Sequence, residues 1–281
     1  MKKINLYQPF EIIYQELTEY SVEEHQHSFF ELVSIVSGTG IQCINNNVFK
    51  YHAGHLFLIT PSDYHSFDIH ESTQFMFIRF NDIYIKSNML DTKEIKQLEF
   101  ILNNANHQPG CILRNKSDKG LVKPLIEAII REHINRDLYD AELIRQIVNT
   151  LIIIVARNIA KLLPDTINTS TETKALDILQ YIQNYIYESD KIKSEVIAKH
   201  FDISESYLGR YFKKHTNETM QQYIINYKLK LIESRLLHSN MRIGEIALEL
   251  GFSDESHMNK IFKKQHNVSP SEYRKKHKIV R

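Results

Sequence analysis

The chain has 281 residues, enough for two domains, and its 42% hydrophobic and 25% charged residues are typical of an ordinary globular protein. The net charge of +1 is unevenly spread: residues 171–281 hold 19 Lys and Arg against 14 Asp and Glu, a surplus of five, whereas residues 1–170 hold 16 against 20. The C-terminal part is therefore suited to a polyanionic partner, although a surplus of five also occurs on ordinary solvated surfaces. Cys43 and Cys111 are isolated in sequence, which argues against a disulfide or cysteine-metal framework.

No feature of the sequence predicts a membrane protein. The first fifteen residues lack the apolar segment of a signal peptide, and the longest unbroken apolar run, residues 151–156, is too short to span a bilayer. We therefore expect a cytoplasmic protein without a membrane partner.

Short apolar segments separated by turn residues occupy residues 12–80. The segment IQCINNNVFKY (41–51) places three asparagines between two alternating stretches, which predicts a β-hairpin. Further strand-like runs follow at 53–67 and 73–80. Several short strands at this spacing predict a β-sandwich or a small barrel.

Beyond about residue 91 the apolar residues recur at intervals of three and four, which predicts helices at 93–103, 121–135 and 140–163. Pro124 is expected in the first turn of the second helix. The third helix, which contains LIRQIVNTLIIIVARNIAKLL (143–163), is apolar over more than one stripe. It can be a core helix packed on the β-domain or a dimerisation helix, and the sequence does not separate these two alternatives.

The segment 164–173 is rich in Thr, Asn and Ser and has no apolar periodicity, which predicts a linker. The expected organisation is therefore an N-terminal domain over 1–163, the linker, and a helical C-terminal domain over 174–281.

A repeated unit lies in the C-terminal domain. An offset of 49 residues pairs Ile197-Ala198 with Ile246-Ala247 and Ser204 with Ser253. One residue is then inserted, and an offset of 50 pairs Leu208 with Met258, Tyr211 with Ile261, Phe212 with Phe262 and Tyr223 with Tyr273. Duplication of one supersecondary unit is the simplest explanation.

Each unit has the pattern helix, short turn, helix. Gly251 stands where the chain must reverse after a first helix, a position suited to a left-handed backbone. Ser204 and Ser253 stand where a hydroxyl can cap the second helix. The pattern predicts a helix-turn-helix whose second helix contacts DNA.

Helical geometry, at about 100° per residue, divides each second helix into an apolar side and a polar, basic side. The apolar residues are Leu208, Tyr211 and Phe212 in the first unit and Met258, Ile261 and Phe262 in the second. The outward residues are Ser206, Arg210, Lys213 and Lys214, then Ser256, Lys260, Lys263 and Lys264, with His257 and Asn259 on the flanks. Such faces can reach base edges and phosphates.

The stretch IALELGFSDESHMNKIFKKQHNVSPSEYR (246–274) resembles the C-terminal motif of AraC-type (AraC/XylS family) transcriptional regulators, and the resemblance covers about the last hundred residues. It implies two helix-turn-helix motifs joined by a long helix, here within 218–238. It also implies DNA contacts from Ser206, Gly209 and Arg210 in the first unit and from Ser256, His257, Asn259 and Lys260 in the second.

Three residues depart from the family pattern. Met258 replaces the usual Phe, which a core tolerates. Lys260 replaces Arg and lacks the planar fork for a bidentate guanine contact. Asn267 replaces Gly and can still adopt a left-handed turn.

The segment HQHSFFELVSIVSG (25–38), followed by Gly54, Pro61 and His65, resembles the two motifs of a cupin barrel, the N-terminal domain of many AraC-type regulators. If the segment is one strand, His25, His27 and Glu31 share a face. We predict a small-molecule effector pocket at His25, His27, Glu31 and His65, with no metal or other cofactor assigned. A divalent metal held by these residues remains the alternative.

The predicted fold is a two-domain α+β chain with a cupin-like β-barrel plus helices, then an all-α domain with two helix-turn-helix motifs. The predicted function is effector-controlled, sequence-specific transcriptional regulation rather than enzymatic catalysis. The expected partners are double-stranded promoter DNA, a small-molecule effector, a second copy of the chain and, for an activator, RNA polymerase. A cupin-type metalloenzyme with a helical appendage is the alternative, and it would not need a duplicated DNA-contacting helix.

Overall fold

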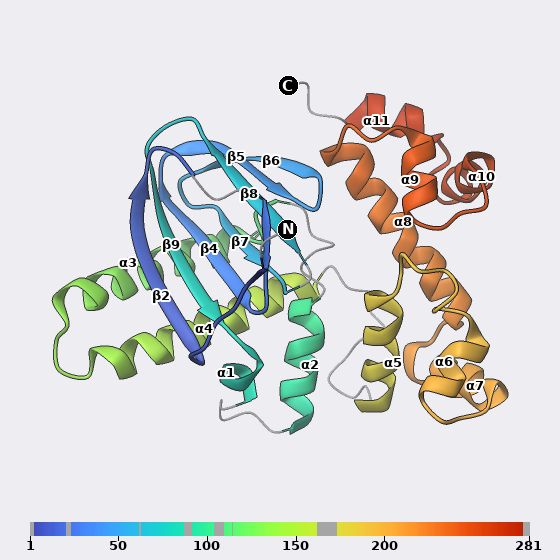
Figure 1. Cartoon of the computed structure of the whole chain (residues 1–281), viewed down its shortest axis with the longest axis horizontal. Helices are drawn as coiled ribbons and strands as arrows, with labels where there is room; N and C mark the ends of the chain where they lie inside the picture. The colour runs from blue at the N-terminus through green and yellow to red at the C-terminus, as the bar shows by residue number, and fades with distance from the viewer. Residues whose placement is uncertain are drawn as a thin grey trace. The chain divides into compact units, whose positions relative to one another are not determined.

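The computed structural model describes residues 3–20, 24–61, 63–86, 92–103, 110–113, 115–161 and 173–277. The chain divides into two compact units, residues 1–163 and 164–281 (Figure 1). The linker predicted at 164–173 lies outside the described residues except for Thr173, which already belongs to a helix.

Two β-sheets dominate the first unit, which confirms the predicted β-rich fold over residues 12–80. The strands are β1 (Lys3–Ile4), β2 (Phe10–Leu17), β3 (His25–His27), β4 (Phe30–Ser37), β5 (Thr39–Ile44), β6 (Asn47–His52), β7 (Leu56–Ile59), β8 (Tyr64–Ile69) and β9 (Thr73–Phe80). One sheet has the order β1-β3-β8-β5-β6 and the other the order β2-β9-β4-β7. Neighbouring strands are antiparallel except for β1 and β3.

The predicted hairpin is present as β5 and β6. Ile44 pairs with Asn47, and the two residues between them, Asn45 and Asn46, have φ angles of 48° and 63°. A two-residue hairpin turn needs left-handed backbone at both positions, and asparagine tolerates it better than most residues.

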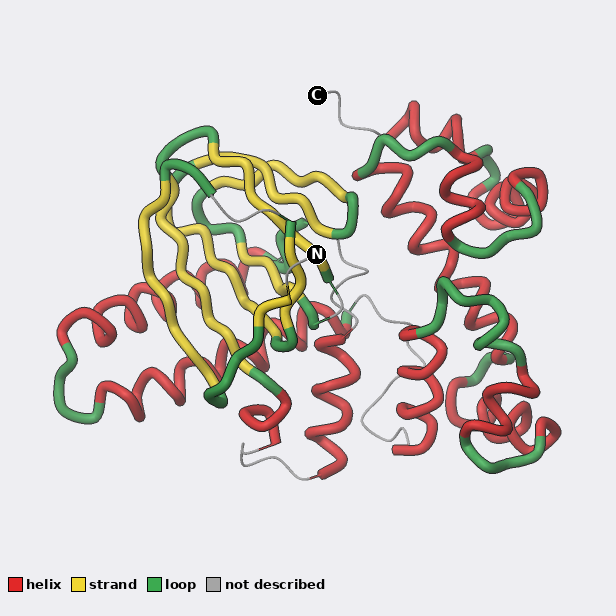
Figure 2. The backbone as a smooth tube through the Cα atoms, viewed as in Figure 1, coloured by secondary structure: helices red, strands yellow, loops and turns green. Residues whose placement is uncertain are grey.

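The four-stranded sheet separates two hydrophobic cores. Val33 and Ile35 of β4 join the aromatic-rich core between the sheets, whereas Phe30 and Leu32 join the core beneath the helices. This division follows from the alternation of side chains along a strand. Glu31 lies between Phe30 and Leu32 and therefore points to the opposite, inner side. The strands of both sheets are yellow in Figure 2.

Helices α1 (Asp82–Lys86), α2 (Thr92–Asn103), α3 (Lys116–Asn135) and α4 (Asp140–Ala160) cover the outer face of that sheet (Figure 1). The position predicted for Pro124 is wrong, because α3 begins eight residues earlier with Asn115 as its N-cap. Pro124 therefore interrupts the interior of a helix, on an exposed side where water can solvate the carbonyl left without a partner.

α4 is, by length and mean hydropathy alone, the one helix of the described residues that could cross a membrane. Half of its apolar window is nevertheless buried within the unit, against α2, α3 and the sheet. Its outward side carries Gln146, Thr150 and Arg157 besides Leu143 and Ile153. The core-helix alternative therefore accounts for most of its apolar residues.

The described residues of the second unit form helices joined by turns, as predicted. Its helices are α5 (Thr173–Asn184), α6 (Ser194–His200), α7 (Glu205–Thr216), α8 (Met220–His238), α9 (Ile243–Glu249), α10 (Glu255–His266) and α11 (Pro270–His277). α8 is the expected long helix, and α7 and α10 lie near its opposite ends (Figure 1). The ring of Phe212 on α7 packs edge-on against Tyr223 of α8, and Arg274 of α11 bonds to the carbonyl of Leu236.

Candidate nucleic-acid interface and buried histidine cluster

Both helix-turn-helix units turn with the same backbone. Asp202 and Gly251 follow α6 and α9 with φ angles of 52° and 65°. The next backbone N–H in each unit, that of Ile203 or Phe252, donates to the carbonyl five residues earlier at 3.0 Å and 2.9 Å. This is the helix-ending motif expected of a left-handed residue, and Asp202 adopts it in the unit that lacks the glycine.

The second helices are capped alike, although not by the residues that the sequence suggested for both. Ser204 caps α7 by accepting from the Tyr207 N–H at 3.2 Å, as predicted. The prediction for Ser253 is wrong: Asp254 caps α10 by accepting from the His257 N–H at 2.7 Å. The residue inserted in the second unit thus lies before the cap, so that Ser204 corresponds to Asp254.

The equivalence continues beyond the helices. Asn217 and Asn267 follow α7 and α10 with φ angles of 59° and 60°, so Asn267 takes the left-handed turn where glycine is usual. Thr219 and Ser269 then cap α8 and α11 through their hydroxyl oxygens. A constant offset of 50 residues therefore relates the two units from Ser204 onward.

Burial separates the two sides of α7 and α10 as helical geometry predicted. Leu208, Tyr211 and Phe212 are buried in α7, and Met258 and Phe262 are buried in α10, while Ile261 is half-buried. The predicted DNA-contacting residues that are exposed are Ser206, Gly209, Arg210, Lys213, Lys214, Ser256, His257, Lys260, Lys263 and Lys264. Asn259 is half-buried. Each helix thus presents a hydrogen-bonding and cationic face outward.

Tyr207 is a residue of this face that the sequence analysis missed. Its side chain is 44% exposed and stacks on Tyr211, with ring centroids 5.6 Å apart. The offset of 50 pairs it with His257, which was predicted, so the repeat itself contained the signal.

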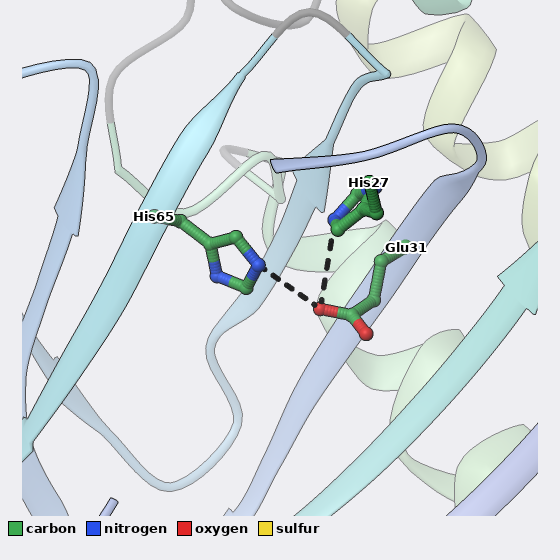
Figure 3. A group of neighbouring side chains, drawn as sticks. All are labelled: His27, Glu31 and His65. Carbon is green, nitrogen blue, oxygen red and sulfur yellow. Dashed lines mark ion pairs between the residues drawn. The ribbon is translucent and has the colours of Figure 1, made fainter. Parts of the chain in front are cut away.

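In the first unit, the side chains of His27, Glu31 and His65 converge from three strands (Figure 3). The expectation of one continuous strand over 25–31 is wrong, since β3 and β4 belong to different sheets. His27 and Glu31 approach each other across the space between the sheets, because the chain changes sheet between these two strands. His65 Nε2 lies 3.6 Å and His27 Nε2 4.0 Å from Glu31 Oε2.

Two neighbours fix how these groups point. The His27 Nδ1–H donates to the carbonyl of Phe29 at 2.6 Å, and the Phe29 ring stacks on the imidazole at 4.3 Å. The Arg79 Nε–H donates to Glu31 Oε1 at 2.7 Å, and Arg79 also pairs with Glu11 at 3.2 Å. Arg79 is the one charged residue of β9, a signal that was available in the sequence but not used.

Burial governs the charge of the cluster. It lowers the pKa of His27 to about 4 and holds the pKa of His65 well below its usual value. Burial also raises the pKa of Glu31, and the adjacent Arg79 opposes that rise. Both imidazoles are therefore neutral at neutral pH, and the contacts drawn as ion pairs in Figure 3 lack the cationic partner under those conditions.

His25, the fourth residue of the predicted pocket, is buried beside the other three. It pairs with His65 across β3 and β8, and the two rings are 4.5 Å apart between centroids. The structure thus brings all four predicted residues into one region, with the three polar atoms of His27, Glu31 and His65 within 4.8 Å of one another.

Comparisons with known proteins agree with this architecture. The family model described as the AraC-like ligand binding domain matches residues 7–148, half of the chain, and a helix-turn-helix domain model matches residues 197–276. The chain is 26% identical over 252 residues to the transcriptional activator RhaS of Mannheimia succiniciproducens, covering 89% of this chain and 88% of that protein. It is 25% identical to the activator RhaR of Cronobacter sakazakii, and the aligned segment covers 89% of this chain and 86% of that protein.

Solved structures are also similar. The C-terminal domain of AraT, a response regulator from Geobacillus stearothermophilus, is 26% identical and covers 40% of this chain and 91% of that one, with a TM-score of 0.38. A single-residue variant of apo ToxT from Vibrio cholerae is 13% identical, and the match covers 95% of this chain and 97% of that one, with a TM-score of 0.35. On the match of its family models, with a ligand-binding-type β-domain followed by two helix-turn-helix units, the chain belongs to the AraC family of DNA-binding transcriptional regulators.

Proposed function

We propose that this regulator recognises promoter DNA through the outward faces of α7 and α10 and responds to an effector bound at the buried histidine cluster. One observation carries the first part: the two faces occupy equivalent positions at a constant offset of 50 residues, with equivalent caps, and most of their residues are exposed. Two equivalent helices of this kind suit two successive segments of one duplex.

The exposed residues divide by chemistry. Arg210 and Lys260 correspond at an offset of 50 and can donate to acceptors on base edges, as can Ser206 and Ser256. The lysines in the last turns, Lys213, Lys214, Lys263 and Lys264, suit phosphate contacts because an ammonium is a point charge without directional fork geometry.

The effector part of the proposal rests on the polar atoms of the first unit. His27, Glu31 and His65 are buried between two sheets whose remaining inward side chains are largely apolar. A few polar groups converging in an apolar interior are typical of a ligand site. Relatives of this chain are named transcriptional activators, so the proposal includes transcriptional activation with contact to RNA polymerase. It also includes a cytoplasmic location and a homodimer as the active species.

The test of the DNA part uses the untagged full chain and fragments of the genome that encodes it. Bound fragments should share a sequence composed of two unlike segments, and their affinity should exceed that for bulk DNA by at least about a thousandfold. The variant Arg210→Ala/Lys260→Ala should lose this preference while keeping its circular dichroism spectrum. Equal retention of all fragments by the wild-type chain would overturn the proposal.

The homodimer is tested separately by sedimentation of the chain with and without its DNA site. A dimer on the DNA is expected. A single chain on a complete, transcriptionally active site would contradict that part of the proposal.

A further inference from the structure

We propose that the first unit binds one divalent first-row transition-metal ion through His27 Nε2, Glu31 Oε2 and His65 Nε2. The inference deepens the proposed function, on which it rests for any regulatory role, because it gives the ligand of the cluster a chemical class.

Three buried polar atoms carry this inference. His27, Glu31 and His65 are 0%, 1% and 0% exposed, and the three named atoms have no hydrogen-bond partner among the residues that the structure describes. Their closest separations, 3.6 Å and 4.0 Å, exceed hydrogen-bond distance. Buried polar atoms that face one another without bonding are costly, and a shared cation would satisfy all three.

The groups around the cluster prepare these atoms for coordination. Since a carbonyl can only accept, the short contact between His27 Nδ1 and Phe29 O places the proton on Nδ1 and leaves the Nε2 lone pair facing the cluster. The bond from Arg79 to Glu31 Oε1 likewise leaves Oε2 for another partner. Both are the outer hydrogen bonds that accompany metal-binding histidines and carboxylates.

Charge also favours a cation. The carboxylates of Glu11 and Glu31 both pair with a single guanidinium, that of Arg79, so these three side chains together carry one negative charge. A divalent ion compensates that charge, whereas an anionic ligand would add to it. Two imidazoles and one carboxylate form a donor set that suits zinc and iron(II).

Space favours an ion over a larger organic molecule. The core between the sheets is filled by aromatic side chains, among them Phe49, Phe67, Phe75 and Phe77. Ligand atoms on a tetrahedral metal stand about 3.3 Å apart, so the three atoms, now within 4.8 Å of one another, need only small side-chain rotations. His25 lies beside His65 but outside this set. Three protein ligands leave the fourth position of a tetrahedral ion for another ligand.

The experiment titrates zinc into the chelator-treated, untagged full chain and measures bound metal by equilibrium dialysis and elemental analysis. The wild-type chain should bind one ion per chain. His65→Gln and Glu31→Gln should each weaken binding by more than about a hundredfold, since loss of an outer partner alone costs 10–100-fold. His55→Gln, a half-buried histidine of the same unit outside the cluster, is the matched control and should bind as the wild type does.

A second measurement needs no variant and so does not depend on variant folding. The X-ray absorption spectrum of the zinc-loaded wild-type chain should show two imidazole ligands at about 2.0 Å and no sulfur. A shell without imidazole, or binding that survives both substitutions, would overturn the inference. So would a wild-type chain that binds no zinc at about ten times its own concentration. A chain that selects its DNA site but binds no metal refutes this inference and leaves the proposed function intact.

Discussion

Ser204 and Asp254 occupy equivalent positions fifty residues apart, and each caps its helix by accepting from the backbone N–H three residues later. A hydroxyl does this in α7 and a carboxylate does it in α10. The hydrogen bond from the His257 N–H, with a further one from Ser253, holds the pKa of Asp254 below its usual value of 3.8. The cap of the second unit therefore titrates, and the cap of the first does not.

The first prediction concerns the stability of the folded chain in acid. Because the pKa of Asp254 is lower in the folded chain than in the unfolded chain, its stabilising contribution is complete above the unfolded value and is lost as pH falls through the folded value. Asp254→Ser should therefore be less stable than wild type at about pH 6, and the difference should shrink as the pH falls below the unfolded value of 3.8 and through the lower folded value. Urea unfolding followed by circular dichroism measures this. Ser204→Ala, expected to cost about 1 kcal/mol at every pH, is the control. A wild-type advantage that is constant down to the acid limit would contradict the prediction.

The second prediction concerns the ion pair that joins α8 to α9. Arg235 is 6% exposed and donates two hydrogen bonds to Glu249, from Nε at 2.9 Å and from Nη2 at 2.8 Å. Glu249→Ala leaves a buried guanidinium without its carboxylate and should cost about 2–3 kcal/mol, less than for a fully buried pair because Glu249 is partly exposed. The double variant Arg235→Met/Glu249→Leu should be more stable than the single one. If the loss of unfolding free energy in the double variant equals the sum of the losses in Arg235→Met and Glu249→Leu, this account is excluded.

The fold was predictable from the sequence wherever one period dominates. Alternation and the paired asparagines specified the β5–β6 hairpin, and the apolar spacing specified α7, α8 and α10. The local prediction failed at Pro124, where propensity favours a helix start but tertiary packing extends α3 through the proline. It failed again at Ser253, since Ser and Asp are both good caps and only the fold decides between adjacent ones.

The histidine cluster was predictable as a set of residues but not as a geometry. A seven-residue segment with alternating histidines fits one strand, and nothing local reveals that the chain crosses from one sheet to the other between His27 and Phe30. The contact of Arg79 with Glu31 is likewise a consequence of β4 pairing with β9, 48 residues away in sequence.

The third prediction separates helix stability from DNA contact at Gly209. This residue lies within α7, it is exposed, and a methyl group added there would meet no atom within 4 Å. Gly209→Ala should stabilise the chain by up to about 1 kcal/mol, because alanine is the better helix former. If the α7 backbone approaches DNA closely, the same change should weaken binding. Gly120→Ala, an equally open helical position in α3, should stabilise without affecting DNA affinity. Unchanged affinity in Gly209→Ala would rule out a close approach there.

The fourth prediction concerns the lysines in the last turns. Lys213 and Lys264 are exposed and suit phosphate contacts, so Lys213→Ala and Lys264→Ala should weaken binding to specific and bulk DNA alike. Each should also lower the slope of log affinity against log salt by about one unit. Fluorescence anisotropy across a salt series measures the slope. A loss confined to the specific site would instead assign these lysines to base recognition.

The last prediction concerns how α7 and α10 share one site. They are equivalent in position but differ in sequence, with Arg210 in one and Lys260 in the other, so the two segments they contact should differ too. If both helices enter major grooves on one face of the duplex, the two DNA segments lie about one helical turn, ~34 Å, apart, and the site for one chain is asymmetric.

Arg210→Ala should cost about 1–3 kcal/mol and relax base preference in one segment only, because guanidinium can bond a guanine edge through two hydrogens. Lys260→Ala should act on the other segment with a smaller effect, since an ammonium lacks that fork. A binding profile across all single-base changes of the site measures both, with Lys213→Ala as the control that should leave base preference unchanged. If Arg210→Ala and Lys260→Ala alter preference at the same base pairs, the two helices do not contact separate segments.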